Sequence, residues 1–315
     1  MNNYLFNRIL TAVMAVFGAM LLIVVLLTFV PGDPATALLG PLATPEYAQQ
    51  FIEEMGLDQP VHVRLWRFFS QVALGSLGTD VITGQSVNSI IAQALPHTFA
   101  LAFASMALAC LLGIPAGVYG AVNKGSMGDT FIAMVSVVFV SVPSFILGIF
   151  MLVVFSVWLD WLPVLGLSES TSLGDRFLRM ILPTVALALG WIGLIARLVR
   201  TSMLEALGQN YIRTARAYGL RDNMIYYKYA LKNAVIPTLA IIGMGMGKLL
   251  GGAVLIEIIF ARQGLGSVLY NALQARNFSV LQGSVFVVVV IFVAVNLVTD
   301  LSYSLFDPRI RYNRR

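Results

Sequence analysis

Few residues of this chain combine a type and a spacing that could do chemistry. The two histidines, His62 and His97, lie far apart in the sequence, and no cluster of His, Cys and carboxylate side chains has the spacing of metal ligands. An enzyme needs several catalytic groups that converge on one site. We therefore expect no catalytic residue, no metal site and no cofactor site in this chain.

The glycine-rich stretch GMGMGKLLGG at 243–252 comes nearest to a phosphate-binding loop, but it lacks the required pattern. Gly243 and Gly247 enclose three residues where the phosphate loop has four, and Leu rather than Ser or Thr follows Lys248. Small residues four positions apart instead let membrane helices approach each other closely. The pairs with this spacing are Gly113/Gly117, Gly243/Gly247 and Gly247/Gly251.

Lys248 lies near the middle of an apolar stretch, where a charge costs about 2.5–3.5 kcal/mol on insertion scales. We expect it to face the path of a transported solute, a partner subunit or an internal cavity, where its role would be structural. Glu257 is nine residues further on and about half a turn out of phase, so the two side chains do not pair on one helix face.

The composition places these residues in a membrane protein. Of the residues, 58% are hydrophobic and 11% are charged, whereas soluble domains carry about 25% charged residues. Six apolar stretches each approach the roughly 20 residues that a membrane helix needs. They lie near 8–30, 97–121, 130–158, 180–200, 236–260 and 281–305. Because a helix satisfies its own backbone in hydrocarbon, we expect an all-α fold with six transmembrane helices.

The Lys and Arg residues predict the orientation. They are concentrated between Arg197 and Lys232 and in the tail 309–315, whereas the short loops on the opposite side hold few. The positive-inside rule therefore places both termini in the cytoplasm. This distribution accounts for the net charge of +5, so we expect no nucleic-acid partner.

The orientation divides the chain into two parts. Residues 1–96 would form the first membrane helix and an outer segment, with short helices at 44–56 and 62–72. Residues 97–315 would form the remaining membrane helices. A cytoplasmic loop at 201–236 interrupts this second part.

The loop contains the basic stretch NYIRTARAYGLRDNMIYYKYALKNAVIP, which runs from Asn210 to Pro237. Ser202 and Glu205 have the spacing of a capping box, which predicts a helix start there. Gly219 predicts the stop of that helix, and a second basic helix would lead to Pro237 at the start of the fifth span.

The first of these helices has two faces. Leu204, Leu207, Tyr211, Ala215 and Tyr218 fall on one face, and Gln209, Arg213 and Arg216 fall on another. Such a helix either lies on anionic lipid or forms a docking surface for a cytoplasmic partner. Its residues alone leave both interpretations open.

The loop resembles the EAA motif of permease subunits of binding-protein-dependent ABC importers. That motif reads Glu-Ala-Ala, three residues, Gly, and later Ile-x-Leu-Pro; here Arg213, Thr214 and Ala215 take the first positions and Gly219 is in place. The Glu-Ala pair is absent and Pro237 falls about five residues late. Both departures are typical of the peptide, opine and nickel branch.

Other stretches extend this resemblance along nearly the whole chain. They are PGDPA after the first span, GLDQP in the outer segment, ILPTVALAL in the fourth span, RTSMLEAL after it, IFARQGLG after the fifth span and DPRIR at the end. The resemblance implies the type I importer fold, in the inner membrane, with no enzymatic activity of its own.

The resemblance also implies partners. Two ATPase subunits would supply ATP and Mg, an extracytoplasmic solute-binding protein would deliver the solute, and a related permease would complete a heterodimer. The ATPases would contact Tyr211, Arg213, Ala215, Arg216, Gly219 and Leu220. The expected substrates are dipeptides or oligopeptides, with nickel chelates, opines or glutathione as alternatives. A secondary transporter fits less well, because only Lys248 could serve ion coupling and no repeated halves are visible.

Overall fold

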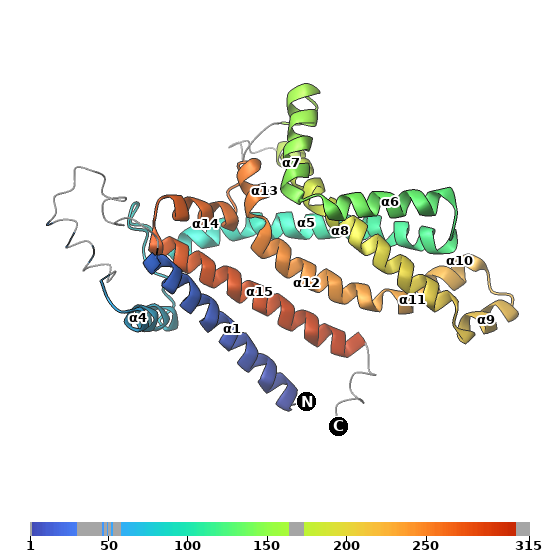
Figure 1. The fold of residues 1–315 in the computed structure, drawn as a ribbon, viewed down its shortest axis with the longest axis horizontal. Helices are drawn as coiled ribbons and strands as arrows, with labels where there is room; N and C mark the ends of the chain where they lie inside the picture. The colour runs from blue at the N-terminus through green and yellow to red at the C-terminus, as the bar shows by residue number, and fades with distance from the viewer. Residues whose placement is uncertain are drawn as a thin grey trace. The chain divides into compact units, whose positions relative to one another are not determined.

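The computed structural model describes residues 2–29, 46, 49, 52, 58–163 and 173–306, and these residues are mostly helical (Figure 1). This confirms the all-α fold class. In chain order the helices are α1 (Asn2–Phe29), α4 (Val61–Ala73), α5 (Val87–Val122), α6 (Met127–Ser141), α7 (Ser144–Leu152), η1 (Val153–Trp158), α8 (Leu173–Leu207), α9 (Asn210–Ala217), α10 (Asp222–Met224), η2 (Ile225–Ala230), α11 (Leu231–Ala234), α12 (Ile236–Gly252), α13 (Val254–Ile259), α14 (Leu265–Gln274) and α15 (Phe278–Phe306); η1 and η2 are π-helical.

Four of these helices, α1, α5, α8 and α15, are long and apolar enough to cross a membrane. Two bent pairs add two more spans if each pair counts as one: 127–141 with 144–158, bent by 98°, and 222–234 with 236–251, bent by 54°. The described residues thus provide up to six spans, in the order expected from the sequence.

Several of the expected boundaries were wrong. Helix α5 begins at Val87, well before the expected start near 97, and α12 ends at Gly252, before the expected end near 260. The third span is broken between Ser141 and Ser144, because Pro143 lacks an N–H group and cannot continue the hydrogen bonding of α6. The fourth span is longer than expected: α8 continues without interruption to Leu207, so Ser202 lies inside this helix and caps nothing. The Ser-x-x-Glu spacing at 202–205 was therefore misleading.

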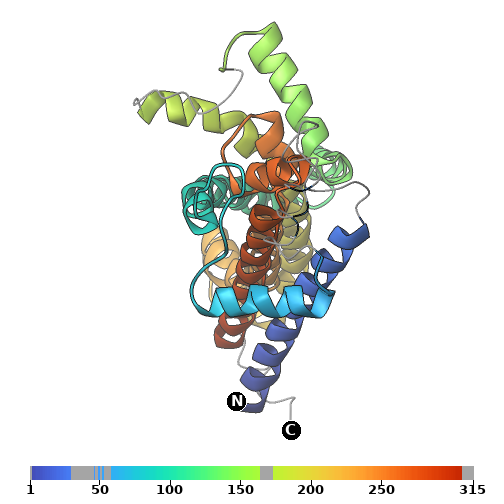
Figure 2. The ribbon, with the colours of Figure 1, turned by 90° about the vertical axis from the view of Figure 1, so that its left-hand side faces the viewer.

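The described chain forms two compact units. The first unit comprises residues 1–98 and 263–293. In it α4 crosses α1 (Figure 2), and Leu65 and Phe68 of α4 are buried against Met20 and Val24 of α1. Helix α4 confirms the helix expected near 62–72, whereas the one expected at 44–56 lies almost entirely outside the described residues.

The second unit comprises residues 99–262 and 294–315 and holds α8 at its centre. Helix α5 approaches α8 at two of the predicted glycines. A Cβ atom added at Gly113 would lie 3.0 Å from the carbonyl oxygen of Ile192, and one added at Gly117 would lie 2.6 Å from that of Ala196. Gly193 of α8 approaches Ser136 of α6 in the same way. Small residues therefore fix α8 against both helices of the α5–α6 hairpin.

The predicted division of the chain into residues 1–96 and 97–315 stays a prediction. Each compact unit combines two segments that are distant in the sequence, so the units do not test a single boundary at residue 96.

Candidate functional site

The segment 201–236 folds back on itself instead of extending away from α8. Helix α9 contacts η2, while η2 and α11 both contact α8. Besides Ala206, six small or aliphatic side chains are buried within the segment and the end of α8. They are Met203, Ile212, Ala215, Ile225, Ala230 and Ala234. The segment thus has a small apolar core of its own, which makes it a compact body attached to two membrane helices.

Gly219 ends α9 as the sequence predicted. Its φ is +71°, in the left-handed region that favours glycine. The N–H of Gly219 donates to the carbonyl of Arg216 at 2.9 Å, and the N–H of Leu220 donates to the carbonyl of Ala215 at 3.3 Å. This pair of hydrogen bonds satisfies the last carbonyl groups of α9 and sets the direction in which the chain leaves the helix.

The second helix of the segment, also predicted, contains the π-helical stretch η2. It is tied to α9 by a hydrogen bond in which the Asn233 side-chain amide donates to the hydroxyl of Tyr211 at 3.1 Å. The chain bends at Val235, where this helix continues into α12. Pro237 occupies the first turn of α12, where backbone N–H groups have no hydrogen-bond partner within the helix, so a residue without an N–H group breaks no helical bond. Pro237 therefore opens the fifth span as expected.

The exposed surface of the segment carries both aromatic and basic side chains. Tyr218 is 81% exposed and Tyr227 is 58% exposed, with Tyr211 and Met224 less so. The basic side chains on this surface are Arg213, Arg216, Arg221, Lys228 and Lys232. Aromatic residues and Arg at an exposed surface are typical of a protein interface.

The predicted contact residues do not all lie on this surface. Tyr211, Arg213, Arg216 and Gly219 are exposed, and Leu220 is half-buried. Ala215 is buried, so it does not form a docking face with Tyr211 and Tyr218 as expected. The helical projection failed here because η2 packs on the side of α9 that carries Ile212 and Ala215. What the exposed residues contact stays a prediction.

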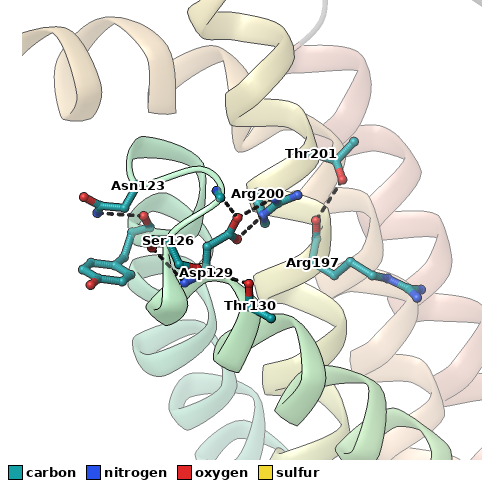
Figure 3. A network of polar contacts seen from close by, with 9 residues as sticks. Asn123, Ser126, Asp129, Thr130, Arg197, Arg200 and Thr201 are labelled. Carbon is teal, nitrogen blue, oxygen red and sulfur yellow. Dashed lines mark hydrogen bonds and ion pairs between the residues drawn. The ribbon is translucent and has the colours of Figure 1, made fainter.

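An ion pair joins the end of α8 to the start of α6 (Figure 3), and the sequence reasoning missed it. The Arg200 guanidinium donates from Nε to Oδ1 of Asp129 at 2.5 Å and from Nη2 to Oδ2 at 2.7 Å. Asp129 is 4% exposed. The backbone N–H of Asp129 donates to Oγ of Ser126, the N-cap residue of α6. The Ser-x-x-Asp spacing of a helix N-terminus could have identified Asp129.

The sequence places Arg197 and Asp300 at similar depth, near the inner ends of the fourth and sixth spans, which predicts an ion pair between them. Arg197 points away from Asp129 (Figure 3), and the side chain of Asp300 lies outside the described residues. The Arg197–Asp300 pair therefore stays a prediction.

Lys248 is exposed on α12, on the side that the rest of the described unit leaves open. Other sides of α12 are covered, because Gly243 packs against Thr299 and Gly245 packs against Met106 and Trp191. Met244, one turn before Lys248, is 45% exposed and shares its face. Among the residues that the structure describes, none encloses Lys248, which leaves lipid, the solute path or another subunit to cover it.

Comparisons with known proteins agree with this arrangement. Residues 113–312 match the family described as the binding-protein-dependent transport system inner membrane component, and residues 1–102 match its N-terminal companion family. A probable peptide ABC transporter permease of Sinorhizobium fredii is 37% identical over 99% of this chain and 100% of its own length. The glutathione transport system permease GsiC of Salmonella paratyphi A is 33% identical over the same shares of the two chains.

The fold has also been seen in crystals. A chain of the inward-facing MetNI methionine ABC transporter superposes with a TM-score of 0.57 and 21% sequence identity, covering 69% of this chain and 96% of that one. At this identity the likeness shows the fold, that of a type I importer permease. Taken with the two matches that together span residues 1–102 and 113–312, it leads to one conclusion: this chain belongs to the family of inner-membrane components of binding-protein-dependent transport systems.

Proposed function

We propose that this chain is the permease subunit of an ABC importer that moves dipeptides or oligopeptides inward across the inner membrane. The observation that carries the proposal is the compact segment 201–236, whose exposed aromatic and basic surface suits a cytoplasmic ATPase. A basic helix resting on lipid needs neither an apolar core nor a defined turn at Gly219. The names of the peptide-permease relatives support the substrate class.

The proposed partners are two cytoplasmic ATPases, an extracytoplasmic solute-binding protein and a second, related permease. ATP and Mg would bind to the ATPases, so this chain would not be an enzyme. The cytoplasmic placement of both termini follows from the basic residues between Arg197 and Lys232. The exposed Lys248 favours a second permease or the solute path on the open side of α12, because a charge facing lipid is costly.

The arrangement suggests how ATP-driven motion would reach the membrane. The ATPases would displace the 201–236 segment as one body, because α9, η2 and α11 share a core. That body is continuous with α8 at one end and meets α12 at Val235 at the other. Displacement of the segment would therefore act on the fourth and fifth spans together and open the path between the two permeases.

The alternative substrates are glutathione, nickel chelates and opines. Glutathione is favoured among them because a glutathione permease is 33% identical over nearly the whole chain. A secondary transporter is the less favoured class, since Lys248 is the one candidate for ion coupling that the sequence offers near mid-span.

Uptake by the reconstituted complex tests the proposed function. We expect purified chain, partner permease, ATPases and solute-binding protein to accumulate labelled dipeptides in vesicles that contain ATP. This uptake should persist when an ionophore abolishes the membrane potential, because ATP supplies the energy. Uptake that requires the potential and proceeds without ATP would contradict the proposal.

Substitutions of Gly219 test the turn. A valine there would be strained by about 1–2 kcal/mol or more, because φ is +71°, whereas Asn tolerates this conformation. No atom outside the turn lies within 4 Å of a Cβ added at Gly219, so neither variant should clash within the chain. We expect Gly219→Val to lower ATPase co-purification and uptake. Gly219→Asn should retain both unless an ATPase backbone approaches this position, in which case both variants lose them. Full retention by Gly219→Val would contradict a role for the turn.

Thiol labelling tests the surroundings of Lys248. We expect Lys248→Leu to insert normally but to transport less, and Lys248→Arg, which keeps the charge, to transport more than the Leu variant. Lys248→Cys and Met244→Cys share an exposed face and should react alike with a water-soluble maleimide, or become protected together when the second permease is present. Reaction of both positions with a lipid-soluble maleimide alone would place this face in lipid and reject the interpretation.

A further inference from the structure

We propose that Asp129 and Arg200 are positioning residues that make α6 move together with α8, so that displacement of the 201–236 segment reaches α6 in addition to α8 and α12. This inference rests on the proposed function, because it assumes that the segment transmits ATPase motion. Asp129 lies in α6 and Arg200 lies in α8, and both precede the segment in the sequence. They would act through the helices that they connect.

The geometry of the pair resists both sliding and rotation. Two parallel hydrogen bonds join the planar guanidinium to the carboxylate, with donor–acceptor distances of 2.5 and 2.7 Å. Such a bidentate contact fixes direction as well as distance, which a single contact does not. The side chains are 29% exposed for Arg200 and 6% exposed for Asp129, so water competes little for the carboxylate.

Asp129 also holds the turn between α5 and α6. Its Oδ2 accepts the backbone N–H of Gly125 at 2.9 Å while Oδ1 and Oδ2 accept from Arg200. Its own N–H donates to Ser126 Oγ at 3.1 Å. One carboxylate therefore connects the α5–α6 turn, the first turn of α6 and the end of α8 (Figure 3).

The neighbouring helix leaves room for this pair. A Cβ atom added at Gly120 of α5 would lie 3.1 Å from Oδ1 of Asp129 and 3.3 Å from Cδ of Arg200. A side chain at Gly120 would have to displace one of the two groups, since both distances are tighter than ordinary packing contacts. Three helices thus converge on the pair.

The position of Arg200 gives the pair its mechanical role. Arg200 precedes the end of α8 at Leu207 by two turns, roughly 10 Å along the axis, and no break separates it from the segment. A displacement applied at α9 would therefore bend or tilt α8 near this point. With the pair in place, α6 would follow; without it, only packing such as that of Gly193 against Ser136 would join α6 to α8, and the path would open incompletely.

The competing explanation is that the pair only stabilises the chain. Replacement of a buried ion pair by apolar residues of similar volume is often neutral for stability, whereas removal of one partner is strongly destabilising. The double variant Asp129→Leu with Arg200→Met therefore separates the two explanations. It can restore packing, but it has no directional contact to make α6 follow α8.

The experiment compares this double variant with wild type in the reconstituted complex. Four quantities are measured for each protein: thermal stability, co-purification of the ATPases, stimulation of ATP hydrolysis by loaded solute-binding protein, and the amount of solute taken up per ATP hydrolysed. We expect the double variant to keep stability and ATPases but to take up about tenfold less solute per ATP, a change within the range of coupled neighbouring side chains. Gly120→Ala, which keeps both charges, should lower the same ratio to a smaller extent.

Arg179→Gln is the matched control, because Arg179 pairs with Asp175 at the opposite end of α8 with both side chains partly exposed. It should leave uptake per ATP unchanged. A stable double variant with the wild-type ratio would overturn the positioning role and leave the proposed function intact. If the double variant instead unfolds, the Arg200→Lys variant decides, because it keeps the positive charge but cannot make two parallel hydrogen bonds to the carboxylate. A wild-type ratio of solute to ATP in this variant overturns the proposal, and a lowered ratio supports it. Absence of ATPases from the wild-type preparation would reject the proposed function itself.

Discussion

Close contact between α8 and the α5–α6 hairpin is the feature on which the rest of the structure depends. In a membrane, apolar side chains gain little by leaving lipid for protein, so helices associate through tight packing and polar contacts. Here the carbonyl oxygens of Ile192 and Ala196 lie against Gly113 and Gly117, and the backbone of Ser136 lies against Gly193. The Asp129–Arg200 pair closes the same bundle where α8 approaches the 201–236 segment. Larger side chains at these glycines would separate the helices.

Because of this contact, the 201–236 segment is attached to a helix, α8, that is itself packed against α5 and α6. The segment has its own buried side chains and a turn fixed by the positive φ of Gly219, and it is continuous with α8. If a flexible linker joined the segment to the membrane helices, movement of the segment would not displace those helices. A compact body on a helix that is packed along its length could transmit displacement, as the proposed coupling to separate ATPases requires.

Much of this could be predicted from the sequence, because the signals were local. The apolar runs predicted the spans, Gly219 predicted a helix end, and Gly113 and Gly117 predicted a close helix contact. The failures came from tertiary context. Pro143 breaks an apolar run that composition alone shows as continuous. Ala215 is covered by η2, whose position depends on how the chain folds back after Gly219.

The ion pair shows the same limit. Asp129 carries a local signal, the Ser-x-x-Asp spacing at the start of α6, but Arg200 is 71 residues away and its choice as partner depends on how α6 packs on α8. Arg197, one turn earlier in α8, points away from Asp129 (Figure 3). The identity of the solute is a different matter, since nothing in the described residues of this chain selects a peptide over another small solute.

The central claim, that α6, α8 and the 201–236 segment move as one body, is tested most directly by distances between paired spin labels. In a background where the single cysteine, Cys110, is replaced by Ser, labels at Phe131→Cys on α6 and Ala217→Cys on α9 would occupy exposed positions. A second label pair, between Ala217→Cys and the partner permease, would report that ATP has driven the motion. We predict that the second distance changes on ATP binding while the distance from residue 131 to residue 217 stays the same. A change in both distances would contradict the account.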